Sequence, residues 1–256
     1  MPQPIGPDYH IHIKLVSDPA LTPDGALVAF TLRWFDSGTI KPRSEIFVID
    51  LGASGPSKGA QPAQPRQLTH ESDSEMPAWS PDGRTVAMLR PDNHSRRQVW
   101  TISAAGGEAK QLTDEPGGVD ALAWSPDGTR IAFRADVAPD LPEPGRDLEK
   151  DPLISVARRL RYREDGFGWR GDRFRHIFIA DVRSRAVKQI TFGEGNDGAP
   201  VWSPDGMSIA FISDFNPFRE ITARTDVNVI PAAGGPPDRR SGGLFMSGSI
   251  AWSPYH

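Results

Sequence analysis

The sequence predicts an all-β fold, a β-propeller of four-stranded blades, and three observations indicate it. The pentapeptide Trp-Ser-Pro-Asp-Gly occurs at Trp79–Gly83, Trp124–Gly128 and Trp202–Gly206. Each copy is followed by short apolar and alternating segments, which are typical of strands. From Trp79 to Trp124 there are 45 residues, and from Trp202 to a fourth Trp, Trp252, there are 50. Units of about 40–50 residues that cannot bury an apolar face alone are typical of propeller blades.

Composition agrees with a folded β protein and excludes several classes. The 256 residues suffice for one large all-β domain or two ordinary ones. The 25 glycines and 25 prolines fit many short strands joined by turns. A net charge of −4 gives no general attraction to nucleic acid or anionic membranes, so neither is an expected partner. The absence of cysteine excludes disulfides and any cysteine-based metal site or nucleophile.

The chain carries no recognisable targeting or membrane segment. No run approaches the roughly 18 apolar residues of a membrane span. The first residues, Met1–Asp8, have neither the basic region nor the apolar region of a secretory signal. We therefore expect no membrane partner and a cytoplasmic location.

The repeated pentapeptide predicts the first strand of each blade and the turn that ends it. Proline presets φ, aspartate can hydrogen-bond nearby backbone, and glycine supplies a positive φ. We assign this turn role to Asp82, Gly83, Asp127, Gly128, Asp205 and Gly206. The tryptophans are expected to pack between blades, because each aromatic side chain buries about 150–250 Å². These are Trp79, Trp124 and Trp202.

The remaining strands follow each turn in a fixed order. A short apolar run predicts the second strand, at 26–30, 85–89, 130–133 and 208–212. An alternating segment predicts the third, at 45–50, 98–102, 176–181 and 227–230. A short fourth strand ends in Gln-Leu-Thr or Gln-Ile-Thr, at 67–69, 111–113 and 189–191. Ala-Ala-Gly-Gly at 104–107 and 232–235 predicts a hairpin between the third and fourth strands.

These elements predict four full blades and the first strand of a fifth. The expected blades cover about 17–69, 76–113, 120–191 with an insert at 136–174, and 198–241, with the next blade beginning at 248–256. The last pentapeptide is cut after Tyr255, so we expect an incomplete ring. The alternative is a compact four-bladed ring, in which Tyr9–Leu15 forms a closing strand paired with Ser249–Trp252.

We predict no catalytic residue in this chain. Gly55–Gly59 matches Gly-x-Ser-x-Gly around Ser57, but a nucleophile elbow requires a strand before the serine and a helix after it. Glycine and alanine precede Ser57, and a proline-containing segment that cannot readily start a helix follows it. A solvated loop is the better interpretation.

We also predict no metal and no cofactor. His10 and His12 would share one face of a strand, but no third ligand lies at local spacing. The three repeated aspartates resemble calcium ligands, yet turn chemistry explains each of them without an ion.

The insert supplies the best candidate for a binding site. Seven arginines fall within 18 residues: Arg158, Arg159, Arg161, Arg163, Arg170, Arg173 and Arg175. Because guanidinium groups match carboxylates and stack on aromatics, Arg158, Arg159, Arg161, Tyr162 and Arg163 are candidates to contact a peptide carboxylate or a second domain. The favoured interpretation is an exposed hairpin whose arginines pair with Glu164, Asp165 and Asp172, each pair contributing about 0–1 kcal/mol.

Acidic loops before each tryptophan are a further candidate. They lie at 70–75, 114–120 and 193–198. They would either attract basic peptides or keep one face of the ring soluble, and the sequence does not distinguish the two.

The repeats resemble those of TolB-type propellers and of the prolyl oligopeptidase family of serine peptidases. Val16–Gly25 resembles the opening of the propeller in acylaminoacyl-peptidase-like members. Arg158–Gly168 is similar to an Arg/Tyr-rich stretch in the same relative place there, and His176–Asp181 follows it in the same order. The resemblance covers essentially the whole chain.

The resemblance implies a propeller that covers an α/β-hydrolase domain and admits only small peptides to its Ser-Asp-His triad. The expected partners are therefore small peptides and a C-terminal hydrolase domain of a longer parent protein. The triad is absent from this chain, which is expected to be inactive alone. The alternative function is that of a TolB-like propeller acting as a protein-binding scaffold.

Overall fold

The computed structural model describes residues 6–52, 63–70, 72–137, 156, 158–165, 168–242 and 248–253. The chain forms two compact units. The first unit comprises Met1–Pro91 and Val99–Gln111, and the second comprises Asp92–Gln98 and Leu112–His256.

The strands of the described residues form four antiparallel, four-stranded sheets and one two-stranded hairpin. The first sheet contains β1 (Leu15–Leu21), β2 (Leu27–Phe35), β3 (Pro42–Asp50) and β4 (Arg66–Gln67). The second contains β5 (Glu75–Trp79), β6 (Thr85–Pro91), β7 (Arg97–Ser103) and β8 (Lys110–Gln111). The third contains β9 (Val119–Trp124), β10 (Arg130–Val137), β13 (Phe174–Asp181) and β14 (Val187–Gln189). The fourth contains β15 (Val201–Trp202), β16 (Ser208–Ser213), β17 (Asp226–Pro231) and β18 (Asp238–Arg239).

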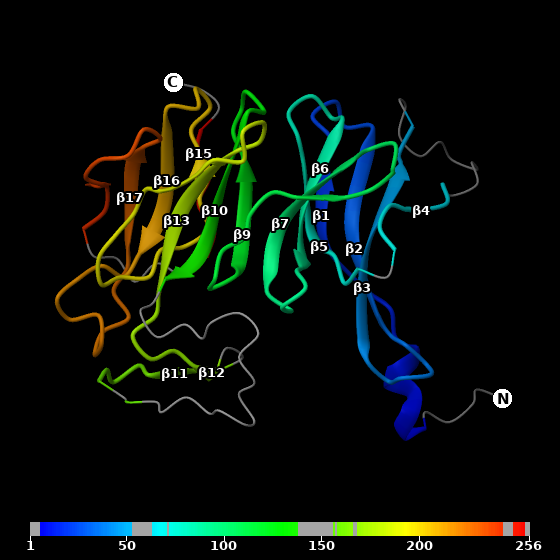
Figure 1. Ribbon diagram of the computed structural model, residues 1–256, viewed down its shortest axis with the longest axis horizontal. Helices are drawn as coiled ribbons and strands as arrows, with labels where there is room; N and C mark the ends of the chain where they lie inside the picture. Colours follow the sequence, from blue (N-terminus) through cyan, green and yellow to red (C-terminus); the bar gives the residue numbers. More distant parts are fainter. Residues whose placement is uncertain are drawn as a thin grey trace. The chain divides into compact units, whose positions relative to one another are not determined.

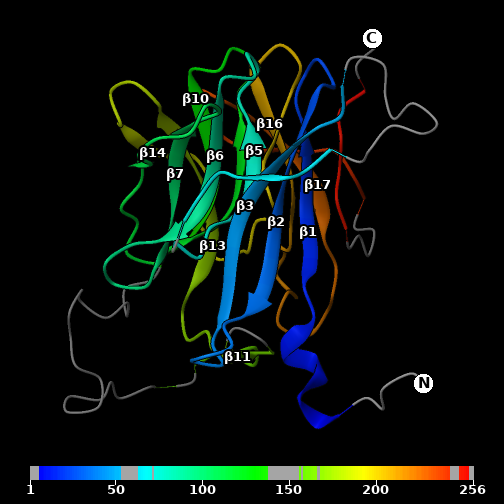
Figure 2. The ribbon, with the colours of Figure 1, turned by 90° about the vertical axis from the view of Figure 1, so that its right-hand side faces the viewer.

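Each four-stranded sheet is a meander, and in the third sheet β10 pairs with β13 across the insert that separates them in sequence. Figure 1 shows β9, β10 and β13 side by side in the second unit, and Figure 2 shows β1, β2 and β3 side by side in the first. No α-helix occurs among the described residues. The predicted all-β fold of four-stranded units is confirmed. The number of blades and the incomplete ring stay predictions.

The stretch before β1 corrects one prediction. Tyr9–Leu15 is not a closing strand, because Pro7–His12 forms a 3-10 helix, η1, and β1 begins only at Leu15. The Tyr9 backbone N–H donates to the Gly6 carbonyl oxygen at 3.1 Å, and a proline at the first helical position favours the helical φ. His10 and His12 therefore do not alternate along a strand.

The repeated turns have the geometry that their sequence predicts. The Ser80 hydroxyl donates to Asp82 Oδ1 at 2.6 Å, and the Arg84 backbone N–H donates to the same oxygen at 3.0 Å. Gly83 follows with φ +68°, a value that non-glycine residues rarely adopt. The same bonds recur around Asp127 and Asp205. The aspartates therefore serve as acceptors within their own turns.

The tryptophans join successive repeats. Trp79 and Trp202 are 8% and 7% exposed and belong to the two apolar cores, whereas Trp124 is half-buried. The indole Nε1–H of each tryptophan donates to a backbone carbonyl of the previous repeat, that of the residue just before the position equivalent to the tryptophan. The bonds run from Trp79 to Ala20 (3.0 Å), from Trp202 to Ala123 (3.1 Å) and from Trp252 to Val201 (3.0 Å). Burial with a satisfied N–H fixes how neighbouring sheets pack within each unit.

A buried polar residue at the start of each third strand was not predicted. The four residues are Glu45, Gln98, His176 and Asp226. Each hydrogen-bonds the chain that follows the fourth strand of its sheet; for example, the Thr113 hydroxyl donates to Gln98 Oε1 at 2.8 Å and the Ser241 hydroxyl to Asp226 Oδ1 at 2.8 Å. Because buried polar groups require partners, this position secures the loops that leave each sheet.

Candidate functional site

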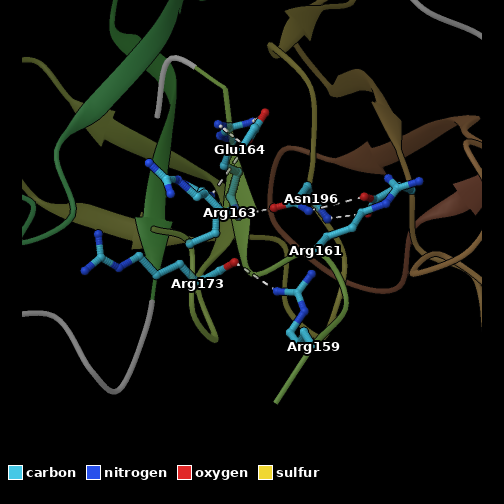
Figure 3. Close-up of a pocket in the computed structure, with 9 residues that line it drawn as sticks. Arg159, Arg161, Arg163, Glu164, Arg173 and Asn196 are labelled. Carbon is cyan, nitrogen blue, oxygen red and sulfur yellow. Dashed lines mark hydrogen bonds and ion pairs between the residues drawn. The ribbon is translucent and has the colours of Figure 1, made fainter. Parts of the chain in front are cut away.

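A pocket lined by arginines lies in the second unit, where the insert between β10 and β13 meets two loops (Figure 3). Its volume is about 230 Å³. It is lined by Arg159, Arg161, Arg163, Glu164, Arg170, Arg173, Arg175, Asn196 and Asp214. Six guanidinium groups and two carboxylates line the pocket, and Asp136 and Glu220 outside the lining each pair with an arginine of the lining. The lining still carries more positive than negative charge, so the pocket favours an anionic group.

The described part of the insert folds back on itself through a short hairpin. Strands β11 (Arg163–Glu164) and β12 (Gly168–Trp169) pair antiparallel, and the Arg170 backbone N–H donates to the Tyr162 carbonyl at 2.7 Å. The Tyr162 and Trp169 rings lie 5.3 Å apart between centroids. These contacts present the arginines on both sides of the hairpin to the pocket.

Arg170 fastens the insert to the third sheet. Its guanidinium donates to both carboxylate oxygens of Asp136, each at 2.7 Å, and its side chain is 8% exposed. Burial alone would lower the pKa of Arg170, but the Asp136 carboxylate, with Glu164 and Asp120 nearby, raises it. A buried bidentate ion pair of this kind stabilises the fold, and its guanidinium group is not available to bind a ligand.

Glu220 fastens the other end of the insert. Its carboxylate accepts from Arg159 Nε at 2.9 Å and from the Arg161 backbone N–H at 3.1 Å. Partial burial acts to raise the pKa of Glu220, but these hydrogen bonds, with the charges of Arg159 and Arg219, lower it overall. The segment between β16 and β17 thus holds the insert in place and sets the position of Arg161.

Arg161 and Arg163 remain available at the pocket. Both are exposed, and neither guanidinium has a carboxylate partner among the residues that the structure describes. Arg161 Nη2 donates to the Thr222 carbonyl at 2.8 Å, which orients its side chain. Figure 3 shows Arg159 directed instead at the Arg173 carbonyl, 3.3 Å away. A ligand carboxylate would meet Arg161 and Arg163 first.

A second, wider pocket of about 550 Å³ shares Arg159 with the first. Phe174 lies under two guanidinium groups, 4.3 Å from Arg159 and 5.5 Å from Arg219. Arg158 lines this pocket and pairs with Asp172 at 3.1 Å, although 71% of its side chain is exposed. Such an exposed pair contributes little to stability.

The structure therefore gathers part of the predicted site. Arg159, Arg161 and Arg163 share one pocket, Arg158 lines its neighbour, and Tyr162 packs on Trp169. The predicted ion pairs are found for Arg158 with Asp172 and for Arg170 and Arg175 with Glu164. The predicted exposure is wrong for Arg170, which is buried against Asp136. Sequence alone gave no signal for Asp136 or Glu220, because each lies 34 or more residues from its arginine partner.

The acidic loops have partners of their own. Glu75 is buried and pairs with Arg33 at 3.0 Å, and Asp120 pairs with Arg134 at 2.7 Å. Asp197 is buried beside His176, 3.3 Å away. These three carboxylates stabilise the loops, whereas Asp114 and Glu194 of the same loops are 77% and 74% exposed.

The other candidates carry no site in the described chain. The Gly55–Gly59 motif with Ser57 lies outside the described residues. Among those described, no group of three or more His, Cys, Asp or Glu residues is placed to hold a metal ion. In the same residues, no helix has the length and apolar character needed to cross a membrane.

Sequence comparison relates the chain to peptidases. No protein-family model matches it. It is 29% identical over 221 residues to the uncharacterized peptidase YuxL of Bacillus subtilis, covering 85% of this chain and 32% of that protein. It is 28% identical over 226 residues to dipeptidyl-peptidase 5 of Porphyromonas gingivalis, covering 81% and 31%. The chain spans about a third of the length of these curated relatives.

Solved structures share the fold. Acylaminoacyl peptidase of Pyrococcus horikoshii superposes with a TM-score of 0.70 at 16% identity, over 94% of this chain and 34% of that one. The β-propeller domain of the Trilobed protease of Pyrococcus furiosus gives 0.53 at 16% identity, over 90% and 58%. TolB of Acinetobacter baumannii gives 0.50 at 18%, over 86% and 44%. The predicted resemblance to peptidase and TolB-like propellers is confirmed.

Proposed function

We propose that this chain is the propeller portion of a prolyl-oligopeptidase-type serine peptidase and limits the access of small peptides to a hydrolase domain that follows it. The observation that carries the proposal is the likeness to acylaminoacyl peptidase over 94% of the chain. Two relatives named as peptidases match most of the chain and support it.

In this proposal the arginine pocket positions the peptide. Arg161 and Arg163 present guanidinium groups that match a carboxylate, while Arg170 and Glu220 hold the insert that carries them. The ligand is a short peptide that offers a terminal or side-chain carboxylate. Catalysis belongs to the following domain and not to this chain.

The test uses the complete protein and one short peptide, compared as its free acid and as its C-terminal amide. In the Arg161→Ala/Arg163→Ala variant, KM for the acid rises about tenfold or more, because charge-assisted hydrogen bonds contribute roughly 1.5–3 kcal/mol each. The kcat stays near the wild-type value, and the amide is unaffected. Arg158→Ala is the matched control, since Arg158 is exposed and lies outside this pocket. Equal effects on acid and amide would refute the positioning role.

The second candidate is a TolB-like scaffold that binds proteins. The superposition on TolB and a 33% identity over 49 residues to a TolB protein of Nitratidesulfovibrio vulgaris favour it. A complete protein that lacks peptidase activity and binds a protein partner through the arginine pocket would support this function over the first.

A further inference from the structure

A second pocket in the same unit differs in chemistry from the arginine pocket. Its volume is about 180 Å³, and it lies between the end of β14, strands β16 and β17, and the turn before β18. Its apolar lining consists of Ile190, Phe192, Phe211, Phe215 and Pro237. No arginine or lysine contributes to it.

One thin wall separates the two pockets. The Asn196 backbone N–H donates to Asp214 Oδ1 at 2.6 Å, and the Asp214 backbone N–H donates to the Asn196 carbonyl at 3.2 Å. Asn196 and Asp214 line the arginine pocket, whereas their neighbours Gly195, Asp197, Ser213 and Phe215 line the apolar pocket. Successive residues of extended chain point to opposite sides, so a single layer of backbone serves both pockets.

This wall is anchored in the core of the unit. His176 Nδ1 lies 3.3 Å from Asp197 Oδ2, and His176 Nε2 lies 3.0 Å from the Gly193 carbonyl. Arg134 Nη1 donates to the Asp197 carbonyl at 3.2 Å. Asp197 is the one carboxylate among the described residues of the lining, and it contacts His176, so the pocket favours a neutral group.

Two glycines allow Phe215 to lie against the wall. A Cβ at Gly195 would come within 2.9 Å of the Phe215 Cβ, and one at Gly193 would lie 3.0 Å from its ring. Gly193 also has φ +104°. Any side chain at these positions would displace Phe215 from the pocket.

The pocket combines a buried floor with exposed aromatic walls. Phe211 is 2% exposed, whereas Phe192 and Phe215 are 70% and 65% exposed. Exposed apolar side chains that lie together around a cavity are typical of ligand-binding or interaction sites. An apolar cavity of about 150 Å³ is large enough to bind benzene, so the volume here accommodates one aromatic ring. Phenylalanine walls offer the edge-to-face and offset contacts that aromatic rings prefer.

We propose that this pocket is a subsite for an uncharged aromatic side chain of a peptide ligand. The assignment of the ligand as a peptide rests on the proposed function, and the neighbouring arginine pocket supplies the polar half of the same binding region. The recognition itself is a property of this chain and requires no hydrolase domain.

The test is a titration of the ¹⁵N-labelled chain with N-acetylphenylalaninamide, which has no charge for the arginine pocket. Saturable NMR shifts are expected at Gly195, Phe215 and Asn228, with N-acetylalaninamide giving none. Phe215→Ala weakens binding about 2–10-fold, because an aromatic pair contributes roughly 0.5–1.5 kcal/mol. Phe192→Ala repeats the test at a second aromatic residue of the lining. Phe218→Ala is the matched control, since Phe218 is 60% exposed and does not line the pocket.

Several results would overturn the proposal. They are an absence of saturable shifts, equal loss of binding in Phe218→Ala, and binding of free indole without binding of the peptide amide. A complete protein without peptidase activity whose propeller still binds N-acetylphenylalaninamide would refute the proposed function and leave the subsite intact.

Discussion

Single side chains fix the turns of this fold, and Asp127 shows how. The Ser125 hydroxyl and the Thr129 backbone N–H lower the pKa of Asp127 to about 2, from an ordinary value of 3.8. A carboxylate with a lowered folded-state pKa stabilises the fold fully above its unfolded pKa, and that stabilisation disappears as the pH falls through the folded value. The turn therefore weakens between about pH 4 and pH 2.

Removing this carboxylate tests the assignment of the repeated aspartate. Asp127→Ala lowers the free energy of unfolding by about 1 kcal/mol near neutral pH, because the change removes three hydrogen bonds from a side chain that is half exposed. Urea denaturation at pH 7 and pH 2.5 measures the free energy of unfolding of both proteins. The difference between the variant and wild type is expected to be smaller at pH 2.5. Asp165→Ala is the control; an equal loss there would contradict the turn role.

Glu220 is the residue on which the shape of the arginine pocket depends. The pKa of Glu220 is lowered, so its carboxylate is ionised above the ordinary carboxyl pKa. In that pH range it makes its full contribution to holding Arg159 and the Arg161 backbone. This hold is lost as the pH falls through the lowered folded value. Glu220→Ala therefore lowers the hydrogen-exchange protection factors across 158–165 at pH 7, and wild type reaches similarly low protection only in acid, once the rates are corrected for the pH dependence of intrinsic exchange. Glu194→Ala, which removes an exposed partner of Arg219 alone, leaves the exchange unchanged; if it also accelerates exchange, the role of Glu220 is wrong.

At the scale of elements, the repeat made most strands predictable and the site only in part. Period-2 alternation located β3, β7, β13 and β17, and the fixed Ser-Pro-Asp-Gly turn located their neighbours. The 3-10 helix at Pro7–His12 was missed because its alternating sequence satisfies a strand equally well. The arginine pocket was only half predicted, since Asp136, Asn196, Asp214 and Glu220 come from distant segments without a local pattern.

The packing of neighbouring sheets depends on the tryptophan that joins them. Trp202→Phe removes the hydrogen bond to Ala123 and weakens the contact with Arg130, whose guanidinium lies 4.7 Å from the indole centroid. We expect a loss of about 1–3 kcal/mol in the free energy of unfolding, because the Ala123 carbonyl loses its donor. Chemical denaturation measures this loss. Trp100→Phe, which removes a bond within one sheet, is the comparison, and a larger effect there would contradict the joining role.

At the scale of the whole molecule, the proposed function makes this chain one part of a peptidase. Its fold is shared with acylaminoacyl peptidase, and it spans about a third of its curated relatives. We propose that its contribution is peptide selection by the arginine and aromatic pockets, and that bond cleavage belongs to a hydrolase domain elsewhere in the complete protein.

The most direct measurement compares hydrolysis of a short blocked peptide by the complete protein and by residues 1–256 alone. We expect turnover by the complete protein that a serine-directed inhibitor abolishes, and none by the isolated chain. Turnover by the isolated chain, or no turnover by the complete protein, would contradict the proposed function.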